Sequence, residues 1–516
     1  MFLIRDALLI LTILKICSGY NILVFFSLPV KSHTILGEGY VKHLLDAGHN
    51  VTFITPIKCD LQHLRLRQVD ISENLNWYPI NIFNAQSIMA KELDVFDFPE
   101  CINFQIGFTQ ATLLMKPIQN LINDENEKFD AVVVEWMYNE LGSGLAAVFD
   151  CPLIWSSSMS PHTFVLSLLG EFINPAYTFH LHTTERLYSF AERVRQLWKS
   201  LHTRYYIWSM TDHYEKIYHN IFGPAILKRG QKPPSYDEVR YNASLLLGNG
   251  NIVSSDSFPL PKNYKDIGGY HIIDVDKPLP ENLKQIMDKA ANGVIYMSFG
   301  SVLRVSSMSE NYRNSILDVL KNTNRTVIFI ADVNLPNLPE NVHMMKWAPQ
   351  LSILAHPNCI LFITHAGLLS LTEAIYFGVP VIGVPFFADQ FYNIDKAAET
   401  GFGRKCVLDG ISTENLKKAI EDVLESPRYL ERAKQLSDTY HHRLASPGKE
   451  LVYWIEHVIR TNGAPHLKSN SLKVEWYKIY YLDLLAVIVL VFILTILVLK
   501  RILSLLNKAE IKSKIN

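Results

Sequence analysis

The stretch that decides the fold runs from residue 347 to residue 393 and reads WAPQLSILAHPNCILFITHAGLLSLTEAIYFGVPVIGVPFFADQFYN. Two short apolar runs in it, residues 360–364 and 381–384, are bounded by turn residues and predict buried parallel strands. A helix is expected between them, from about Ser370. Polar residues directly follow each run, and an open α/β sheet binds its ligands beyond the carboxyl ends of its strands. The stretch therefore predicts a ligand site on a strand–helix–strand unit.

The same alternation of strands and helices appears in both halves of the chain before this stretch. In the first half, strands are expected over 22–26 and 51–55, with a helix from about Thr34 that ends at Gly48. The second half restarts the pattern with strands and one helix in the following order: strand 294–297, helix 311–320, strand 327–330 and strand 344–346. Two restarts of one pattern predict an α/β protein of two facing Rossmann-like domains.

The domain boundaries are expected at residues 20–260 and 261–465, with extended linker segments over 258–262 and 278–281. Neither half contains the GxGxxG fingerprint, which argues against a dinucleotide cofactor. A net charge of −1 argues against nucleic acid as a partner. The six cysteines show no metal-binding spacing, so no metal site is predicted, and one disulfide of unspecified pairing is possible.

The two ends of the chain predict secretion and membrane anchoring. Residues 1–19 have the short polar start, apolar run and small residues of a signal peptide. Residues 482–499 are almost wholly apolar, follow an aromatic belt and precede Lys500 and Arg501, as in a transmembrane helix. Residues 500–516 are then a basic cytosolic tail, and the bulk of the chain is luminal. This placement makes Asn50, Asn242 and Asn324 glycosylation candidates.

Four polar positions in the second half suit a diphosphate. Ser301 follows the strand at 294–297, and His365, Gly367 and Ser370 surround the start of the helix after 360–364. Helix N-termini present free amides and a positive dipole to anions. Glu373 lies among apolar residues and needs a partner, which two ribose hydroxyls would supply.

The remaining positions suit a base and a sugar. Trp347 is able to stack on a uracil, the Ala348 backbone to read its edge, and Gln350 to reach the ribose. Asp389 and Gln390 form an acid–amide pair on the loop after the strand at 381–384, where they suit sugar hydroxyls. Each residue alone has a structural alternative, and Trp347 alone would more often lie in the core. Their joint spacing favours a nucleotide-sugar site.

These residues carry a specific resemblance. Phe362-Ile-Thr-His365-Ala-Gly367, Ser370, Glu373, Pro380, Pro385 and Asp389-Gln390 match the signature of the UDP-glycosyltransferases, and the chain resembles the membrane-bound animal branch over nearly its whole length. The Leu-Leu-Ser after Gly367 is similar to insect members. Ala366 departs from the family, which usually has a second Gly there. The resemblance implies a GT-B fold, and the tail with lysines third and fifth from its end resembles an endoplasmic reticulum retrieval signal.

The resemblance also implies a catalytic pair. His33 follows the first strand and is implied to be the general base, since imidazole titrates near neutral pH. The family orients this base with an Asp, and this chain has Glu135 at that position. Glu140 is a second candidate for the same role.

The expected reaction is an inverting transfer of a hexose, with UDP-glucose favoured over UDP-glucuronate, to a hydroxyl of a small lipophilic acceptor. No cofactor is expected, because the UDP-sugar is a co-substrate. Aromatic-rich segments at about 57–125 and 155–240 suit an apolar acceptor pocket. A membrane lipid glucosyltransferase, a UDP-glucuronosyltransferase and a non-catalytic UDP-sugar-binding protein remain as alternatives. The acceptor, O- against C-glycosylation, and a homo- or hetero-oligomeric state stay open.

Overall fold

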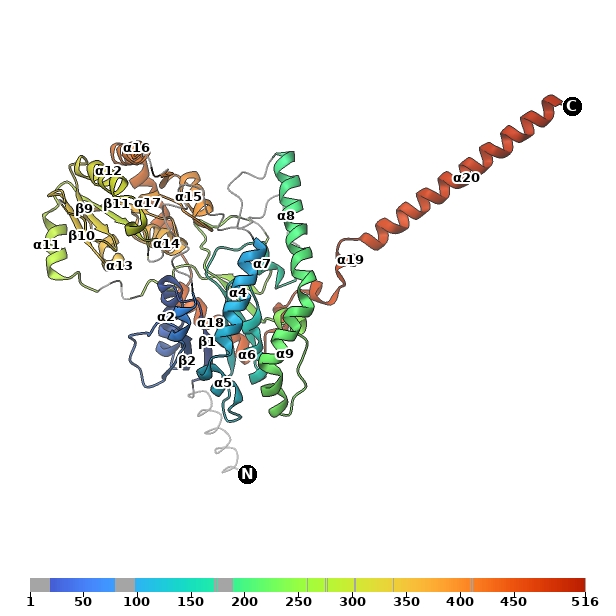
Figure 1. The fold of residues 1–516 in the computed structure, drawn as a ribbon, viewed down its shortest axis with the longest axis horizontal. Coiled ribbons are helices and arrows are strands. Elements are labelled where there is room, and N and C mark those ends of the chain that lie inside the picture. Colours follow the sequence, from blue (N-terminus) through green and yellow to red (C-terminus); the bar gives the residue numbers. More distant parts are fainter. Residues whose placement is uncertain are drawn as a thin grey trace.

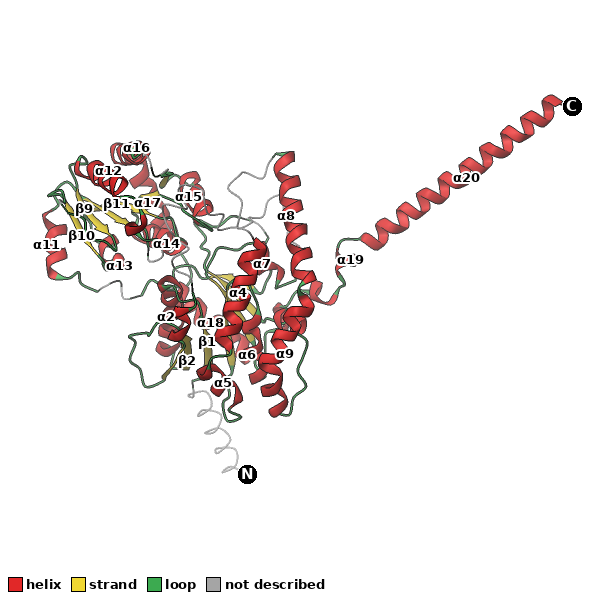
Figure 2. Ribbon diagram, viewed as in Figure 1, coloured by secondary structure: helices red, strands yellow, loops and turns green. Residues whose placement is uncertain are grey.

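The structure is a computed structural model that describes residues 19–78, 98–170, 174, 189–257, 259–273, 275, 277–300, 303–336, 338–408, 410 and 412–515. Residues 1–18 of the expected signal peptide lie outside these ranges, as does Ser301. Two parallel sheets with helices on both faces form the body of the protein, and one long helix projects from it (Figures 1 and 2). The predicted α/β fold of two Rossmann-like domains is confirmed.

The first sheet has seven parallel strands in the order β3-β2-β1-β4-β5-β6-β7. Its strands are β1 (Asn21–Phe25), β2 (Asn50–Thr55), β3 (Leu66–Asp70), β4 (Ala131–Trp136), β5 (Leu153–Ser157), β6 (Leu245–Gly248) and β7 (Tyr264–Asp266). Its helices are α2 (Lys31–Asp46), α4 (Phe98–Leu113), α5 (Lys116–Asn123), α6 (Gly144–Phe149), α7 (Thr163–Ser167), α8 (Phe190–Ser209), α9 (Thr211–Lys228) and α10 (Tyr236–Arg240). The central strands are apolar runs because both of their faces are covered.

The second sheet has six parallel strands in the order β10-β9-β8-β11-β12-β13. Its strands are β8 (Val294–Ser298), β9 (Thr326–Ile330), β10 (Val342–Met345), β11 (Cys359–Thr364), β12 (Val381–Gly383) and β13 (Gly403–Lys405). Its helices are α11 (Glu281–Lys289), α12 (Glu310–Lys321), α13 (Gln350–Leu354), α14 (Leu368–Phe377), α15 (Gln390–Glu399), α16 (Glu414–Glu425) and α17 (Pro427–His441).

Each sheet has a point at which the strand order reverses. In the first sheet the chain moves outward from β1 to β3 and then returns to place β4 on the other side of β1. In the second sheet β11 returns in the same way to the free side of β8. Helices that leave the two central strands there diverge and open a crevice, so this is where such sheets bind ligands.

The first domain is built from two separate parts of the chain. Strand β7 pairs with β6, so the first sheet continues to Asp266. Helix α18 (Pro447–Arg460) then returns to pack against α2 and β4. Its Leu451, Ile455 and Val458 recur at helical spacing and are buried in the core of the first domain. The chain therefore crosses between the domains twice, after β7 and before α18.

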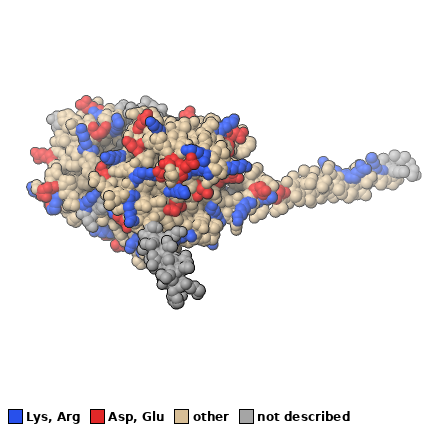
Figure 3. Space-filling model, turned by 90° about the horizontal axis from the view of Figure 1, so that it is seen from below, with Lys and Arg blue, Asp and Glu red and all other residues tan. Residues whose placement is uncertain are grey.

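The projecting helix is α20 (Leu482–Ile515), which follows the short α19 (Trp476–Ile479). Its segment Leu482–Ala509 is long and apolar enough to cross a membrane, and none of its most apolar window is buried in the body. The predicted span 482–499 lies inside it, and the tail continues the same helix. Charges of both signs are interspersed over the body, whereas the projecting helix has an uncharged middle stretch between Asp483 near its start and the basic residues toward its end (Figure 3).

Candidate active site

A histidine and a carboxylate meet at the reversal point of the first sheet. His33 is the third residue of α2, the helix that follows β1, and Glu135 is the penultimate residue of the adjacent strand β4. Glu135 Oε1 lies 2.5 Å from His33 Nδ1, and the Glu135 side chain is only 2% exposed. A carboxylate in this position accepts the Nδ1–H, which leaves Nε2 as the basic nitrogen of the ring.

The second candidate, Glu140, lies elsewhere. Its Oε1 accepts a hydrogen bond of 2.9 Å from Trp136 Nε1, and its Oε2 lies 3.5 Å from Arg240 Nη1. Of the two carboxylates that the sequence left open, the structure brings Glu135 to His33.

Asp389 approaches this pair from the second domain, at the start of α15. Burial raises the pKa of Asp389, while the hydrogen bond from Asn393 Nδ2 (2.8 Å) and the nearby His33 act in the opposite direction. Desolvation, and after it the nearby Cys101 and Asp389, raise the pKa of Tyr138, a partly buried first-domain residue with a φ of 55°. The carboxyl ends of the two sheets therefore face one another across one site.

His365 lies between two glycines at the reversal point of the second sheet. A Cβ atom on Gly300, which has a φ of 75°, would lie 2.8 Å from His365 Cε1. A Cβ atom on Gly367 would lie 2.5 Å from His365 Nε2, so neither position accommodates a side chain without moving the ring. Burial lowers the pKa of His365 to about 4, and the imidazole is neutral at neutral pH.

Ala366 has a left-handed backbone with a φ of 64° and is fully buried. A residue with a Cβ atom costs about 1–2 kcal/mol in this region, which explains physically why glycine suits the position. Asn393 Nδ2 donates to the Ala366 carbonyl (3.2 Å) as well as to Asp389. One amide thus links the loops after β11 and β12. The sequence contained Asn393 four residues after Asp389, but no role was assigned to it.

Glu373 and Gln350 form a buried polar network. Gln350 Nε2 lies 2.6 Å from Glu373 Oε2 and 3.2 Å from Ser370 Oγ, and Tyr296 donates its hydroxyl to Gln350 Oε1 (3.2 Å). His271, from the segment between the domains, places Nε2 3.3 Å from Glu373 Oε1. The partner that a buried carboxylate requires is therefore already supplied by protein groups, which hold Glu373 in one orientation.

Trp347 and Ala348, which follow β10, differ in exposure: the first is exposed and the second is buried. The Trp347 side chain is 73% exposed, so the alternative that it lies in the core is wrong. Ala348 is buried in the core under α13 with Ile353 and Leu354. An exposed indole three residues before Gln350 in the chain offers a face on which a flat ring can stack.

Gln390 has a role in the loop itself. Its Oε1 accepts hydrogen bonds from the backbone amides of Phe386 (2.8 Å) and Phe387 (3.1 Å), so it shapes the loop that presents Asp389. The structure brings Asp389, His365, Gly367, Ser370, Glu373 and Gln350 to one edge of the second sheet. Ser301 lies outside the described residues.

A small cavity of about 40 Å³, lined by apolar side chains and by the Glu140–Arg240 pair, lies beside the catalytic edge of the first domain. Its lining includes Ile102, Trp136, Tyr138, Phe164 and Ile207. Of the aromatic residues that suggested an acceptor pocket, Phe164 lines this cavity, whereas Tyr205 and Trp208 are exposed on α8. Phe96, Tyr177, Phe179 and Tyr188 lie outside the described residues.

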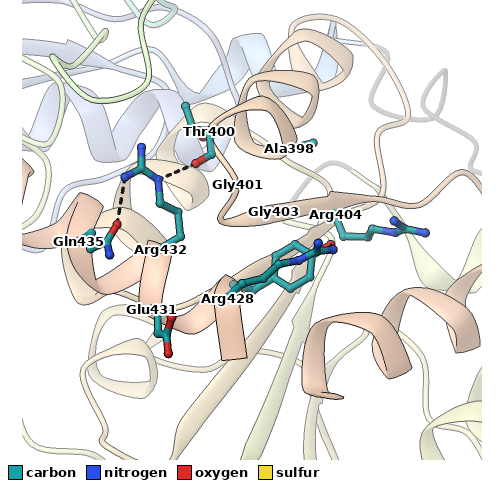
Figure 4. A pocket seen from close by; sticks show the side chains of 10 residues that line it. Ala398, Thr400, Gly401, Gly403, Arg404, Arg428, Glu431, Arg432 and Gln435 are labelled. Carbon is teal, nitrogen blue, oxygen red and sulfur yellow. Dashed lines mark hydrogen bonds between the residues drawn. The ribbon is translucent and has the colours of Figure 1, made fainter. Parts of the chain in front are cut away.

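A larger cavity, of about 600 Å³, lies at the opposite edge of the second sheet. It is bounded by the end of α15, the start of β13 and one face of α17 (Figure 4). Arg432 Nε donates to the Thr400 carbonyl (2.8 Å), and Arg404 pairs with Asp422 (3.0 Å). Its basic groups are thus engaged in binding neighbouring elements.

The three sequons are on the surface. Asn50, Asn242 and Asn324 are exposed, and Lys468 Nζ contacts the Asn242 side-chain oxygen at 2.6 Å.

Comparison with known proteins agrees with this geometry. The chain is 29% identical over 506 residues to the UDP-glycosyltransferase UGT5 of Dactylopius coccus, covering 94% of this chain and 92% of that protein. It is 29% identical to the UDP-glucuronosyltransferase 2B19 of Macaca fascicularis, with 89% and 88% covered. The UDP-glucosyltransferase 2 of D. coccus is 27% identical, with 92% and 91% covered.

Solved glycosyltransferases share the fold. The glycosyltransferase of kitacinnamycin aligns with a TM-score of 0.56 at 16% identity, covering 86% of this chain and 99% of that chain. LpCGTa, solved in complex with UDP, aligns with a TM-score of 0.54 at 14% identity, covering 86% and 99%. Residues 31–514 match the family described as "UDP-glucoronosyl and UDP-glucosyl transferase". The chain belongs to this UDP-glycosyltransferase family.

Proposed function

We propose that the protein is an inverting UDP-glycosyltransferase that moves glucose from UDP-glucose to a hydroxyl of a small lipophilic acceptor. The observation that carries this proposal is the His33–Glu135 contact of 2.5 Å at the edge of the first sheet, facing Asp389 of the second. A base on one domain and a sugar-binding carboxylate on the other are what a single displacement between two bound substrates requires.

In the proposed reaction His33 Nε2 takes the acceptor hydroxyl proton, and Glu135 stabilises the imidazolium that forms. The acceptor oxygen forms a bond to the anomeric carbon as the bond from that carbon to the UDP oxygen breaks, so an α-linked donor gives a β-glycoside. Asp389 holds a sugar hydroxyl. These steps call for no metal and no cofactor beyond the UDP-sugar.

The donor lies along the edge of the second sheet in this proposal. Trp347 stacks on the uracil, and the Ala348 backbone reads its edge. Glu373, held by Gln350, binds the ribose. The amides at the start of α14, with Ser301, Ser370 and a neutral His365, receive the leaving diphosphate.

Glucose is the proposed sugar because the insect relatives include a UDP-glucosyltransferase, and UDP-glucuronate is the second candidate because primate relatives are UDP-glucuronosyltransferases. The aromatic side chains around the small cavity of the first domain, Trp136, Tyr138 and Phe164, support a lipophilic acceptor. A membrane lipid acceptor is tested alongside small phenols.

We further propose a single-pass type I protein of the endoplasmic reticulum membrane with both domains in the lumen, alone or as an oligomer. The span within Leu482–Ala509, the basic residues after it and the exposed sequons support this orientation.

The test uses microsomes that contain the full chain, labelled UDP-glucose or UDP-glucuronate, and a panel of phenols and membrane lipids. We expect labelled product from UDP-glucose and a phenol, and none from His33→Ala, which should still bind UDP within a few fold. Activity retained by His33→Ala would overturn the role of His33. Equal labelling from UDP-glucuronate would overturn the choice of glucose. UDP binding with no product from any acceptor would favour the non-catalytic alternative.

A further inference from the structure

The loop that follows β6 belongs to the first domain and lies at the active-site edge of its sheet. Residues 249–257 leave the carboxyl end of β6, and the His33–Glu135 pair lies at the carboxyl ends of β1 and β4 in the same parallel sheet. Asn251 of this loop is buried, and its Oδ1 accepts the backbone amide of Val253 (3.0 Å). A side-chain acceptor of this kind holds the turn of the loop in place.

Contacts cross between the domains in both directions at this loop. Val253 packs against the second-domain core cluster that includes Leu371 of α14, and Asn251 Nδ2 lies 3.5 Å from Thr372 Oγ1 on the same helix. In the other direction, Tyr392 of α15 packs against the core cluster of the first domain. The two domains therefore meet along α14 and α15, the helices that follow β11 and β12.

Asp256 of the loop binds one face of α15. Tyr392 and Lys396 are four residues apart in this helix, so they lie on the same face of it. The Tyr392 hydroxyl donates to Asp256 Oδ2 (2.6 Å), and Lys396 Nζ pairs with Asp256 Oδ1. Burial, and after it the Asp256 carboxylate, raises the pKa of Tyr392, so the phenol stays protonated and acts as the donor. One carboxylate of the first domain thus holds a helix of the second.

Helix α15 carries the sugar-binding end of the proposed donor site. Asp389 is the residue directly before the helix, and Gln390 and Asn393 lie in its first turn. Gln390 Oε1 accepts the Phe386 amide (2.8 Å), and Asn393 Nδ2 donates to Asp389 Oδ2 (2.8 Å), so the loop after β12 is tied to the helix. A change in the orientation of α15 therefore changes the position of Asp389 relative to His33.

We propose that Asp256 is a positioning residue for the transferred sugar, which holds α15 through Tyr392 and Lys396 so that Asp389 meets the hexose opposite His33. This inference rests on the proposed function, because it takes the sugar hydroxyl as the ligand of Asp389. Binding of the sugar half of the donor then depends on Asp256, whereas binding of the UDP half does not, since the groups proposed for UDP lie on α14 and on the loop after β10.

The experiment measures the Kd of UDP and of UDP-glucose by calorimetry, and kcat by glucosyl transfer, on the full chain in detergent micelles. We expect Asp256→Ala to raise the Kd of UDP-glucose and to lower kcat, each by about tenfold, because a misplacement of about 1 Å costs up to about 100-fold in rate. The Kd of UDP should stay within about twofold of the wild type. Tyr392→Phe, which removes one hydroxyl, should raise the Kd of UDP-glucose by about fivefold.

Two comparisons separate positioning from a general effect on the fold. The double variant Asp256→Ala/Tyr392→Phe should bind UDP-glucose as Asp256→Ala does, because the two changes break the same contact. Asp395→Ala is the matched control, since Asp395 lies on the same helix but pairs with Lys405 (2.8 Å) inside the second domain. All its constants should stay within about twofold of the wild type, as for a partly exposed ion pair.

Unchanged UDP-glucose binding and kcat in Asp256→Ala and Tyr392→Phe would overturn the role of Asp256. Equal losses of UDP and UDP-glucose binding would also overturn it, because they would show a defect of the whole domain. A wild type that binds UDP-glucose but transfers it to no acceptor would contradict the proposed function alone. The ratio of the two Kd values would still test the role of Asp256 in that case.

Discussion

Shortening Glu135 by one methylene, in Glu135→Asp, should lower kcat even though Asp is the residue expected from family resemblance. The carboxylate lies 2.5 Å from His33 Nδ1. Removing one carbon–carbon bond of about 1.5 Å withdraws it to about 4 Å if the backbone stays in place. The strand β4 is buried along its length and paired on both sides, so the backbone has little freedom to follow.

The expected magnitude follows from the charge that forms on His33 in the transition state. At an effective dielectric constant of about 20, opposite unit charges attract by about 6.6 kcal/mol at 2.5 Å and by about 4.2 kcal/mol at about 4 Å. The difference of about 2.4 kcal/mol corresponds to a roughly 60-fold loss of kcat. The KM for UDP-glucose should be unchanged, because Glu135 contacts the base and lies outside the donor loops.

The assay is steady-state glucosyl transfer by the full chain in microsomes, with the product measured by chromatography. Glu140→Asp is the matched control, because Glu140 is a nearby carboxylate bound to Trp136 and Arg240. The kcat of Glu140→Asp should stay within about threefold of the wild type, because the Glu140 carboxylate does not stabilise the transition state. Glu135→Asp with more than half of wild-type kcat, or an equal loss in Glu140→Asp, would refute the argument.

Three further predictions concern the donor edge. Gly367→Ala should weaken UDP binding at least tenfold by calorimetry, because its Cβ would displace the His365 ring, whereas Gly107→Ala, with no atom within 4 Å, should leave binding unchanged. Ala366→Gly should raise the free energy of unfolding by about 0.5–1 kcal/mol in a denaturant titration, as relief of left-handed strain outweighs the added freedom of the unfolded chain. Burial lowers the pKa of His365 to about 4, so the unfolded chain binds more protons between about pH 6.5 and pH 4, and stability falls as the pH drops through that window. Between pH 7 and pH 5 the wild type should lose about 2 kcal/mol of its free energy of unfolding through His365. The His365→Gln variant should lose about 2 kcal/mol less than the wild type over the same range, and identical pH profiles of the two proteins would contradict the assignment.

Much of the fold followed from local pattern. The runs at 22–26, 51–55, 294–297 and 360–364 correspond to β1, β2, β8 and β11, because strands covered on both faces are continuous apolar runs. The edge strands β7 and β13 have three residues each and carry polar side chains, so no periodic signal marks them. The return of α18 to the first domain was not predicted, since an apolar helical stripe does not specify which core buries it.

The sequence by itself determined the family, the two-domain α/β architecture, the apolar span near the carboxyl end and the residue types along the donor edge, because these depend on local composition and spacing. Only the tertiary structure decided which groups meet. It brought Glu135 rather than Glu140 to His33, placed His271 against Glu373, and set Asp389 opposite His33 across the two sheets. The partners in each of these contacts are at least 102 residues apart in the sequence. The physical reason is that parallel strands distant in sequence become neighbours where the strand order reverses, and only the folded sheet brings their carboxyl ends together.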